Sequence, residues 1–232
     1  FFPVETSRLL VVTTLAIYEH DFLDKTSSLF SSNSLSIQKG FGNGQSIFGS
    51  AVESGIFRLG KNYAMNRCIS KEKGNEINPS CITIDFKNRI WAGSLEKGLI
   101  VYENGAITRF TYPEIKNYTI RKIITEQDHL YLGTIGKGFA LVKHAKVSQL
   151  KFDALSDKNI KPIFQSSDSS IWIGTRLDGL QRIKNGKLST FTGNEGLLQN
   201  GVTTIGYSNE SIYDWSTSGI SLIHLKPNQV VY

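Results

Sequence analysis

The sequence predicts an all-β protein, and within that class a β-propeller of about six four-stranded blades. A short motif recurs at a nearly constant interval along the 232 residues, and four strand-like segments surround each clear copy. Helical periodicity is nearly absent. Four short strands repeated every 40 residues or so, about the length of one blade, are typical of propellers.

The recurring motif is an aromatic residue in the second strand, followed two residues later by glycine in its three clearest copies. Its clearest copy is Ile171-Trp172-Ile173-Gly174-Thr175. The aromatic positions are spaced 40, 41 and 41 residues apart, at Trp91, Tyr131, Trp172 and Tyr213. We expect these rings to pack between blades rather than to form a sugar-stacking surface, and Gly174 to allow close backbone approach.

The fifth repeat shows the four strands most clearly. Turn residues at Asp168-Ser169 and Asn185-Gly186 separate them, and Asn-Gly between two strands is a strong hairpin signal. The predicted strands are 160–165, 170–175, 179–184 and 187–191. A single sheet of this kind cannot bury both faces, so stacking of successive blades explains why the pattern repeats.

The repeats cover the whole chain, which predicts one propeller domain over residues 1–232. The expected blades are 1–32, 33–77, 78–116, 117–158, 159–199 and 200–232. Either these six blades close a ring, or the chain is a fragment of a seven-bladed ring or of a longer array. The strand-like ends at Phe1 and Tyr232 favour a piece of a larger protein.

Composition gives weak guidance about partners. The 26 basic and 20 acidic residues leave a net charge of +6, and the basic residues are scattered. This predicts either a mildly basic surface or affinity for an acidic ligand such as a sulfated or uronic-acid glycan. Nucleic acid is not expected, because no basic stripe is interleaved with aromatic residues.

The spacing of the cysteines argues against a zinc site, and the hydropathy of the chain argues against a membrane-spanning segment. Cys68 and Cys81 lack zinc-site spacing, so we expect two buried thiols and no metal. The longest apolar stretch, 9–18, is too short to span a bilayer. Contact with a membrane is therefore expected only through a separate span in a parent protein.

Three segments of the fifth repeat resemble the two-component regulator propeller repeat. They are 170–175 (SIWIGT), 179–182 (GLQR) and 196–202 (GLLQNGV), and looser copies extend the resemblance over nearly the whole chain. The resemblance implies the periplasmic or cell-surface sensor region of a hybrid two-component histidine kinase. Such sensors often detect products of polysaccharide breakdown, and the kinase, the membrane span and a second propeller are not in this chain.

No catalytic constellation accompanies the repeats. The four histidines belong to no HExxH motif, and no GxSxG or Walker element appears, which predicts a module without catalysis or cofactor. Two alternatives remain. One is an envelope structural or adhesion propeller that binds protein or surface polysaccharide. The other is a propeller lyase with a His and a Glu over the central channel.

A series of asparagines marks the expected ligand site. They precede the first strand of successive blades at intervals of 45, 39, 42 and 41 residues, at Asn33, Asn78, Asn117, Asn159 and Asn200. This places them on one rim of the channel. They either cap turns through their own side chains or offer amide groups to sugar hydroxyls.

Loops between the second and third strands open on the same rim, at Glu53, Glu96, Lys97, Lys137, Arg176 and Asp178. They are either solvated loops or part of the site, with Arg176 as a bidentate clamp for an anionic sugar. The predicted ligand-binding residues are Asn117, Asn159, Asn200, Arg176, Asp178, Lys137, Glu96 and Lys97. The expected partners are an oligosaccharide and either a neighbouring propeller or a second copy of the chain.

Overall fold

Six four-stranded antiparallel sheets follow one another along the chain in a computed structural model. The structure describes residues 2–5, 8–12, 16–32, 37–42, 47–51, 55–59, 65–69, 79–95, 97–103, 106–108, 112–126, 128–143, 146–149, 159–208, 210–225 and 228–231. The chain divides into two compact units, Phe1–Asn117 and Tyr118–Tyr232. Each unit is described by itself.

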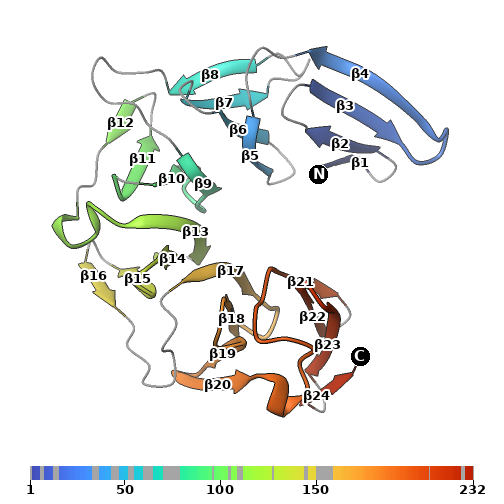
Figure 1. The fold of residues 1–232 in the computed structure, drawn as a ribbon. Coiled ribbons are helices and arrows are strands. Elements are labelled where there is room, and N and C mark those ends of the chain that lie inside the picture. Colours follow the sequence, from blue (N-terminus) through green and yellow to red (C-terminus); the bar gives the residue numbers. More distant parts are fainter. Residues whose placement is uncertain are drawn as a thin grey trace. The chain divides into compact units, whose positions relative to one another are not determined.

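The first unit contains three sheets, in each of which sequential strands pair with one another (Figure 1). A short 3₁₀ helix, η1 (Pro113–Ile115), follows the third sheet. The strands are β1 (Phe2–Glu5), β2 (Arg8–Val12), β3 (Ala16–Asp21), β4 (Thr26–Ser32), β5 (Ile37–Gly42), β6 (Ile47–Ala51), β7 (Gly55–Leu59), β8 (Met65–Ile69), β9 (Pro79–Ile84), β10 (Ile90–Ser94), β11 (Leu99–Glu103) and β12 (Ala106–Thr108).

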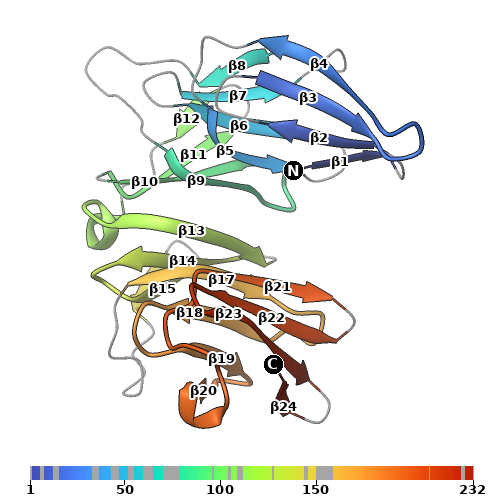
Figure 2. The same cartoon turned by 45° about the vertical axis from the view of Figure 1, so that its right-hand side comes forward.

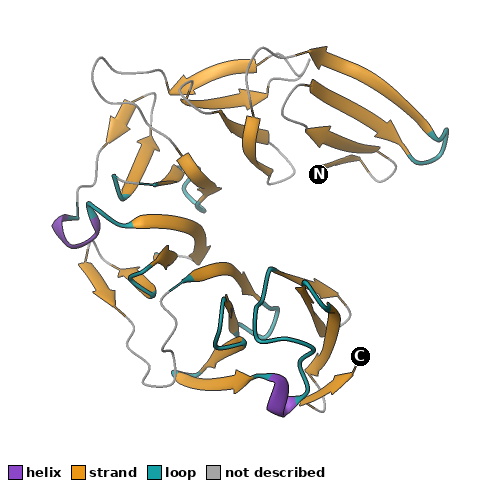
Figure 3. Ribbon diagram, in the orientation of Figure 1, coloured by secondary structure: helices purple, strands orange, loops and turns teal. Residues whose placement is uncertain are grey.

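The second unit repeats the same arrangement three more times (Figure 2). Its strands are β13 (Thr119–Glu126), β14 (His129–Ile135), β15 (Phe139–Lys143), β16 (Lys146–Gln149), β17 (Ile160–Gln165), β18 (Ile171–Thr175), β19 (Leu180–Lys184), β20 (Lys187–Phe191), β21 (Thr204–Ser208), β22 (Ser211–Ser216), β23 (Gly219–Leu225) and β24 (Asn228–Val231). A second 3₁₀ helix, η2 (Gly193–Glu195), follows β20. Both helices are single turns (Figure 3), and no described helix is long and apolar enough to cross a membrane.

Neighbouring sheets share hydrophobic clusters, as expected for blades stacked face to face. Trp172, fully buried in β18, packs with Ile212 and Ile223 of the following sheet. This confirms the predicted role of Trp172 between sheets. A second cluster in the same unit joins Phe139 of β15 to Ile160, Ile163, Ile171 and Ile173. In the first unit, Phe48 and Ile56 pack against Ile82, Ile84, Ile90, Ala92 and Ile100.

Gly174 shows why the motif requires a glycine. A Cβ atom there would lie 2.3 Å from Pro162 Cγ and 2.5 Å from Val202 Cγ1. The side chains of Pro162 and Val202 therefore pack directly on the β18 backbone and leave no room for a Cβ atom at residue 174. We expect Gly174→Ala to lower the free energy of unfolding by about 1–3 kcal/mol, the usual cost of overpacking. Chemical denaturation of the variant measures this change. Ser189→Ala, at an exposed position of β20, is the control.

Trp91 and Trp172 are also held by polar contacts at the turn between the first and second strands of their sheets. Trp91 Nε1 donates to Asp85 Oδ2 at 2.8 Å, and the Arg89 guanidinium lies 5.2 Å from the Trp91 ring centroid. Trp172 Nε1 donates to Ser166 Oγ at 3.2 Å, with the Arg182 guanidinium 5.3 Å from its ring. Both tryptophans therefore combine an apolar environment with a satisfied indole N–H and a stacked cation.

Asp85 is ionised more readily than an ordinary aspartate because of these contacts. Burial raises the pKa of its carboxyl, but hydrogen bonds from Trp91 and Arg89, together with the Arg89 charge, lower the pKa by more. The Arg89 Nε donates to Asp85 Oδ2 at 2.6 Å. The cluster thus keeps a negative charge beside the indole and the guanidinium.

Asp214 is the opposite case, a buried carboxylate in β22 with no hydrogen-bond partner for either oxygen among the described residues. It stands where the preceding repeat has Ile173, and it shares a strand face with Ile212, which packs on the preceding sheet. Desolvation raises the pKa of Asp214 to about 6.

The cysteine prediction is tested at one position. Cys81 is a buried thiol in β9, as expected. The side chain of Cys68 lies outside the described part of the chain.

Candidate functional site

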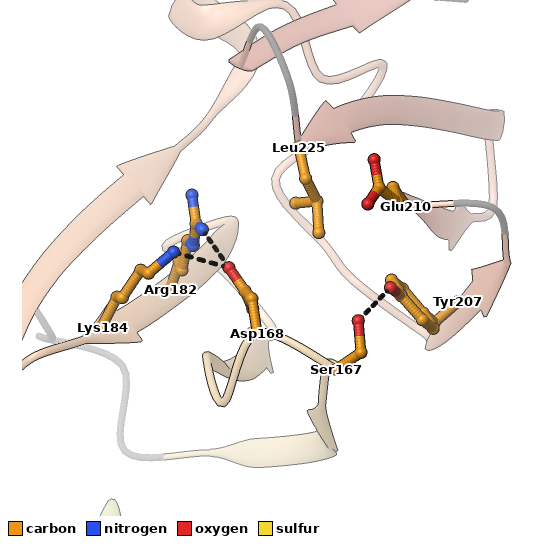
Figure 4. A pocket seen from close by; sticks show the side chains of 7 residues that line it. All are labelled: Ser167, Asp168, Arg182, Lys184, Tyr207, Glu210 and Leu225. Carbon is orange, nitrogen blue, oxygen red and sulfur yellow. Dashed lines mark hydrogen bonds and ion pairs between the residues drawn. The ribbon is translucent and has the colours of Figure 1, made fainter.

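A pocket of about 400 Å³ opens between the sheets β17–β20 and β21–β24 of the second unit. It lies where the turns between first and second strands meet the ends of the third strands. Charged, hydroxyl and apolar groups line it: Ser167, Asp168, Arg182, Lys184, Tyr207, Glu210 and Leu225 (Figure 4). These residues come from segments far apart in sequence, so the pocket depends on the stacking of the two sheets.

One wall is built around Asp168 in the β17–β18 turn. Its Oδ2 accepts hydrogen bonds from Arg182 Nη2 and Lys184 Nζ, both at 2.8 Å, and its Oδ1 accepts one from the Ser170 backbone N–H at 3.1 Å. Ser166 Oγ donates to the same Oδ1. The β17–β18–β19 meander brings these groups together, because the turn after β17 lies beside the end of β19.

These contacts keep Asp168 ionised. Partial burial raises the pKa of its carboxyl, but hydrogen bonds from Lys184, Ser166 and Ser170 lower the pKa by more, leaving it well below the ordinary range. The wall therefore presents a carboxylate shared by two cations.

Arg182 is the rigid element of this wall. It is buried, donates from Nε to Ser170 Oγ at 3.0 Å, and stacks on Trp172. Lys184 is more exposed, with its ammonium group held by Asp168. A ligand in the pocket would thus meet a preorganised ion cluster with the more exposed Lys184 ammonium at its edge.

The opposite wall belongs to the last sheet. Tyr207 of β21 shares a hydrogen bond of 2.6 Å with Ser167 Oγ across the two sheets, and its ring stacks on Phe164 of β17. Glu210 occupies the β21–β22 turn, where its backbone carbonyl accepts from Leu225 N at 3.0 Å. Leu225 supplies the apolar surface (Figure 4).

This combination suits the binding of a polar molecule. It offers hydroxyl donors and acceptors, carboxylates, two cations, one phenol ring and one aliphatic side chain within a single hollow. Among the described residues, no group of three or more His, Cys, Asp or Glu side chains is placed to hold a metal ion. The described histidines contact neighbours in their own sheets: His20 contacts Ser27, His129 contacts Asp128 and His224 contacts Ser211.

Three of the residues predicted to bind ligand lie near one another at the opposite ends of these strands from the pocket. Arg176 is exposed and Asp178 half-buried in the β18–β19 loop, where Gly179 N donates to the backbone carbonyl of Asn200. The side chain of Asn200 accepts from Gly193 N at 2.8 Å. Asn200 therefore stabilises the turn around η2, which is one of the two roles considered for the asparagine series.

The other predicted residues lie on separate loops. Lys137 is exposed between β14 and β15, and Asn159 is half-buried immediately before β17. Asn117 and Lys97 are exposed in the first unit, at its last residue and in the β10–β11 loop. Glu96, like Asn33, Asn78 and Glu53, lies outside the described residues.

The pocket residues were missed because the prediction followed one end of the strands. Asp168 was identified only as a turn residue. A signal was present in the sequence: in a meander, residues in the first turn face residues at the end of the third strand, which pairs Asp168 with Arg182 and Lys184. Tyr207 carried no such signal, since its approach to Ser167 depends on the angle between two sheets.

Comparisons with known proteins show similarity in fold. No family model and no curated protein sequence matches the chain. Two structures of the extracellular domain of BT4673 from B. thetaiotaomicron, a putative one component or hybrid two component system, match 95% of this chain at 17% and 16% identity, with TM-scores of 0.77 and 0.73. The chain spans 32% of the length of each.

Virginiamycin B lyase from Staphylococcus aureus matches 99% of this chain and 81% of its own length, at 11% identity and a TM-score of 0.78. At such identities the likeness concerns architecture alone. The chain therefore has a propeller-like all-β fold, which it shares with the extracellular domain of BT4673 and with virginiamycin B lyase.

Proposed function

We propose that the chain is a non-catalytic ligand-binding part of an extracytoplasmic two-component sensor, with its six sheets serving as propeller blades. The observation that carries the proposal is the pocket between β17–β20 and β21–β24, with its preorganised ion cluster. The fold similarity to the extracellular domain of a putative hybrid two component system supports the sensor role and the location.

The chemistry of the pocket favours a glycan fragment as ligand. Sugar hydroxyls both donate and accept hydrogen bonds, so they can use Asp168, Lys184 and the Ser167–Tyr207 pair at once. The two cations already share Asp168, and Glu210 adds a second carboxylate to the lining. We therefore propose a neutral oligosaccharide for this pocket. An anionic sugar would better suit the loop that carries Arg176.

We expect Lys184→Ala to weaken oligosaccharide binding about ten- to a hundredfold, since a hydrogen bond to a charged group contributes on the order of 1.5–3 kcal/mol. Tyr207→Phe removes a neutral hydroxyl, whose hydrogen bond contributes about 0.5–1.5 kcal/mol, so binding should weaken about two- to tenfold. The side chains are partly exposed, so melting should change little. Titration calorimetry with panels of neutral and uronic-acid oligosaccharides measures the affinities. Lys187→Ala, an exposed lysine of β20 outside the pocket, is the matched control.

The same titrations distinguish the pocket from the predicted rim. Unchanged affinity in both pocket variants, with weaker binding in Arg176→Ala and Asn200→Ala, would transfer the site to the rim. Chemical analysis of the recovered oligosaccharide checks the absence of catalysis. Cleavage or elimination products formed at a constant rate would favour the lyase alternative, to which the fold of virginiamycin B lyase lends a precedent.

A further inference from the structure

The β3–β4 hairpin of the first unit displays apolar side chains that face solvent. Tyr18 and Leu29 lie directly opposite each other across the two strands, and Phe22 follows at the turn. Leu29 is 59% exposed and Leu23, at the tip, is 79% exposed. Exposed apolar groups gathered on one short element, rather than scattered singly, mark interaction surfaces.

The turn that carries the tip is well ordered by local contacts. Asp21 Oδ1 accepts from Leu23 N at 2.8 Å and from Asp24 N at 3.3 Å. The His20 ring meets the Phe22 ring edge-on at 4.8 Å, and His20 Nδ1 is 2.9 Å from Ser27 Oγ of β4. A defined turn therefore carries the exposed Phe22 and Leu23. Figures 1 and 2 show the β3–β4 hairpin to which this turn belongs.

β4 is also an outer strand, since it pairs with β3 alone in its sheet. Its seven residues, Thr-Ser-Ser-Leu-Phe-Ser-Ser, carry no charge and no proline. Other fourth strands of the described sheets are shorter. β8, β16 and β20 contain Arg67, Lys146 and Lys187, while β12 and β24 have three and four residues. Short length and charge protect outer strands from pairing with another chain, and β4 has neither protection. Its one irregularity is a register shift against β3 at Phe30, which leaves the Thr26–Leu29 segment regularly paired.

The β4 sequence is suited to pairing with itself. Leu29 is the central residue, so antiparallel pairing about a two-fold axis at Leu29 sets Thr26 opposite Ser32 and Leu29 opposite Leu29 of a second copy. No like charges meet in this register. Tyr18 beside Leu29 in each copy would extend the apolar contact on both sides.

We propose that two copies of this chain associate through β4, forming one continuous antiparallel sheet across a two-fold axis. The occupant of the apolar hairpin face is thus a second copy. A lipid surface suits the tip less well, because Asp21 and Asp24 flank Phe22 and Leu23, whereas only Lys25 carries a positive charge.

Sedimentation velocity of the chain over a range of concentrations tests the proposal. We expect a reversible dimer for the wild type and loss of the dimer in Leu29→Lys, which places two like charges opposite each other at the axis. Leu177→Lys introduces the same charge at a leucine of similar exposure, 65%, in the second unit, and should leave the dimer intact.

Cysteine cross-linking tests the register. Leu29→Cys should form an intermolecular disulfide under mild oxidation, because the two positions meet at the axis. Thr26→Cys should not, because its two copies would lie about 20 Å apart along the strands. The wild type, which keeps Cys68 and Cys81, provides the background.

Three results would overturn the proposal. One is a wild type that stays monomeric throughout, and another is a dimer that survives Leu29→Lys. The third is cross-linking at Thr26→Cys in place of Leu29→Cys. Binding of the monomer to anionic lipid vesicles, lost in Phe22→Ser, would instead assign the hairpin tip to a membrane surface and equally contradict the self-pairing. None of these results bears on the oligosaccharide pocket of the second unit.

Discussion

Replacing Trp172 by alanine is expected to lower the free energy of unfolding by about 3–5 kcal/mol, the usual range for a large buried aromatic. Trp172 has no exposed surface and packs with Phe191 of its own sheet and with Ile212 and Ile223 of the next. The substitution would also remove the indole N–H bonded to Ser166 and the ring under the Arg182 guanidinium.

Chemical denaturation followed by far-ultraviolet circular dichroism measures this loss. Trp172→Phe is the matched variant, since it keeps a ring in the cluster but removes the hydrogen bond, and it should cost clearly less than alanine. An alanine variant within about 1 kcal/mol of the wild type would mean that Trp172 does not hold the two sheets together, whatever its burial.

Replacing Asp214 by asparagine is expected to stabilise the protein at neutral pH by up to about 3 kcal/mol. The pKa of Asp214 is about 6 in the folded chain, against an ordinary value of 3.8. Each unit of difference corresponds to about 1.4 kcal/mol between the two protonation states. Keeping this carboxylate ionised where it is buried without a hydrogen-bond partner among the described residues therefore costs stability, and a neutral amide of the same shape avoids that cost.

The sign of the pH dependence follows from the two pKa values. Well below the ordinary value of 3.8 the carboxyl is protonated in both folded and unfolded chains, so variant and wild type should differ little there. Between about pH 4 and 6 the unfolded chain releases this proton while the folded chain retains it. Wild-type stability therefore falls relative to Asp214→Asn as pH rises, and the difference is constant above that range.

Unfolding free energies measured from pH 4 to pH 8 for both proteins test this expectation. Glu114→Gln, which neutralises an exposed carboxylate, is the control and should show no such pH-dependent difference. A flat difference between Asp214→Asn and the wild type would show that Asp214 finds a partner or solvent in the folded protein.

The sequence predicted the strands accurately where its repeat was strongest. In the fifth repeat the first and last strands match the predicted 160–165 and 187–191, and the two middle strands begin one residue later than expected. The signal there is local, since Asn-Gly turns and aromatic spacing depend on a few neighbouring residues. The contacts that fasten each indole, Asp85 with Trp91 and Ser166 with Trp172, were not foreseen because the acceptors differ in chemistry between repeats.

The candidate site shows the limit of repeat spacing more clearly. Spacing indicates which residues occupy equivalent positions, and it placed the asparagine series at one end of the strands. Repeat spacing does not indicate which of these equivalent positions line a pocket. The pocket arises instead from particular side chains of two successive repeats, such as Lys184 and Glu210, and from the approach of Tyr207 to Ser167. The eight residues first predicted to bind ligand stay a prediction.

Among the described residues, each hydrophobic cluster joins two successive sheets. A sheet with this pattern needs compatible surfaces only toward its immediate neighbours. Duplication or exchange of one 40-residue segment, about one repeat, would then create few new contacts to be optimised. Because each sheet depends only on its neighbours, genetic recombination can add or exchange a repeat without disturbing distant sheets. For the same reason, residues of one pocket between two sheets, such as Asp168 and Tyr207, can change without affecting the other sheets.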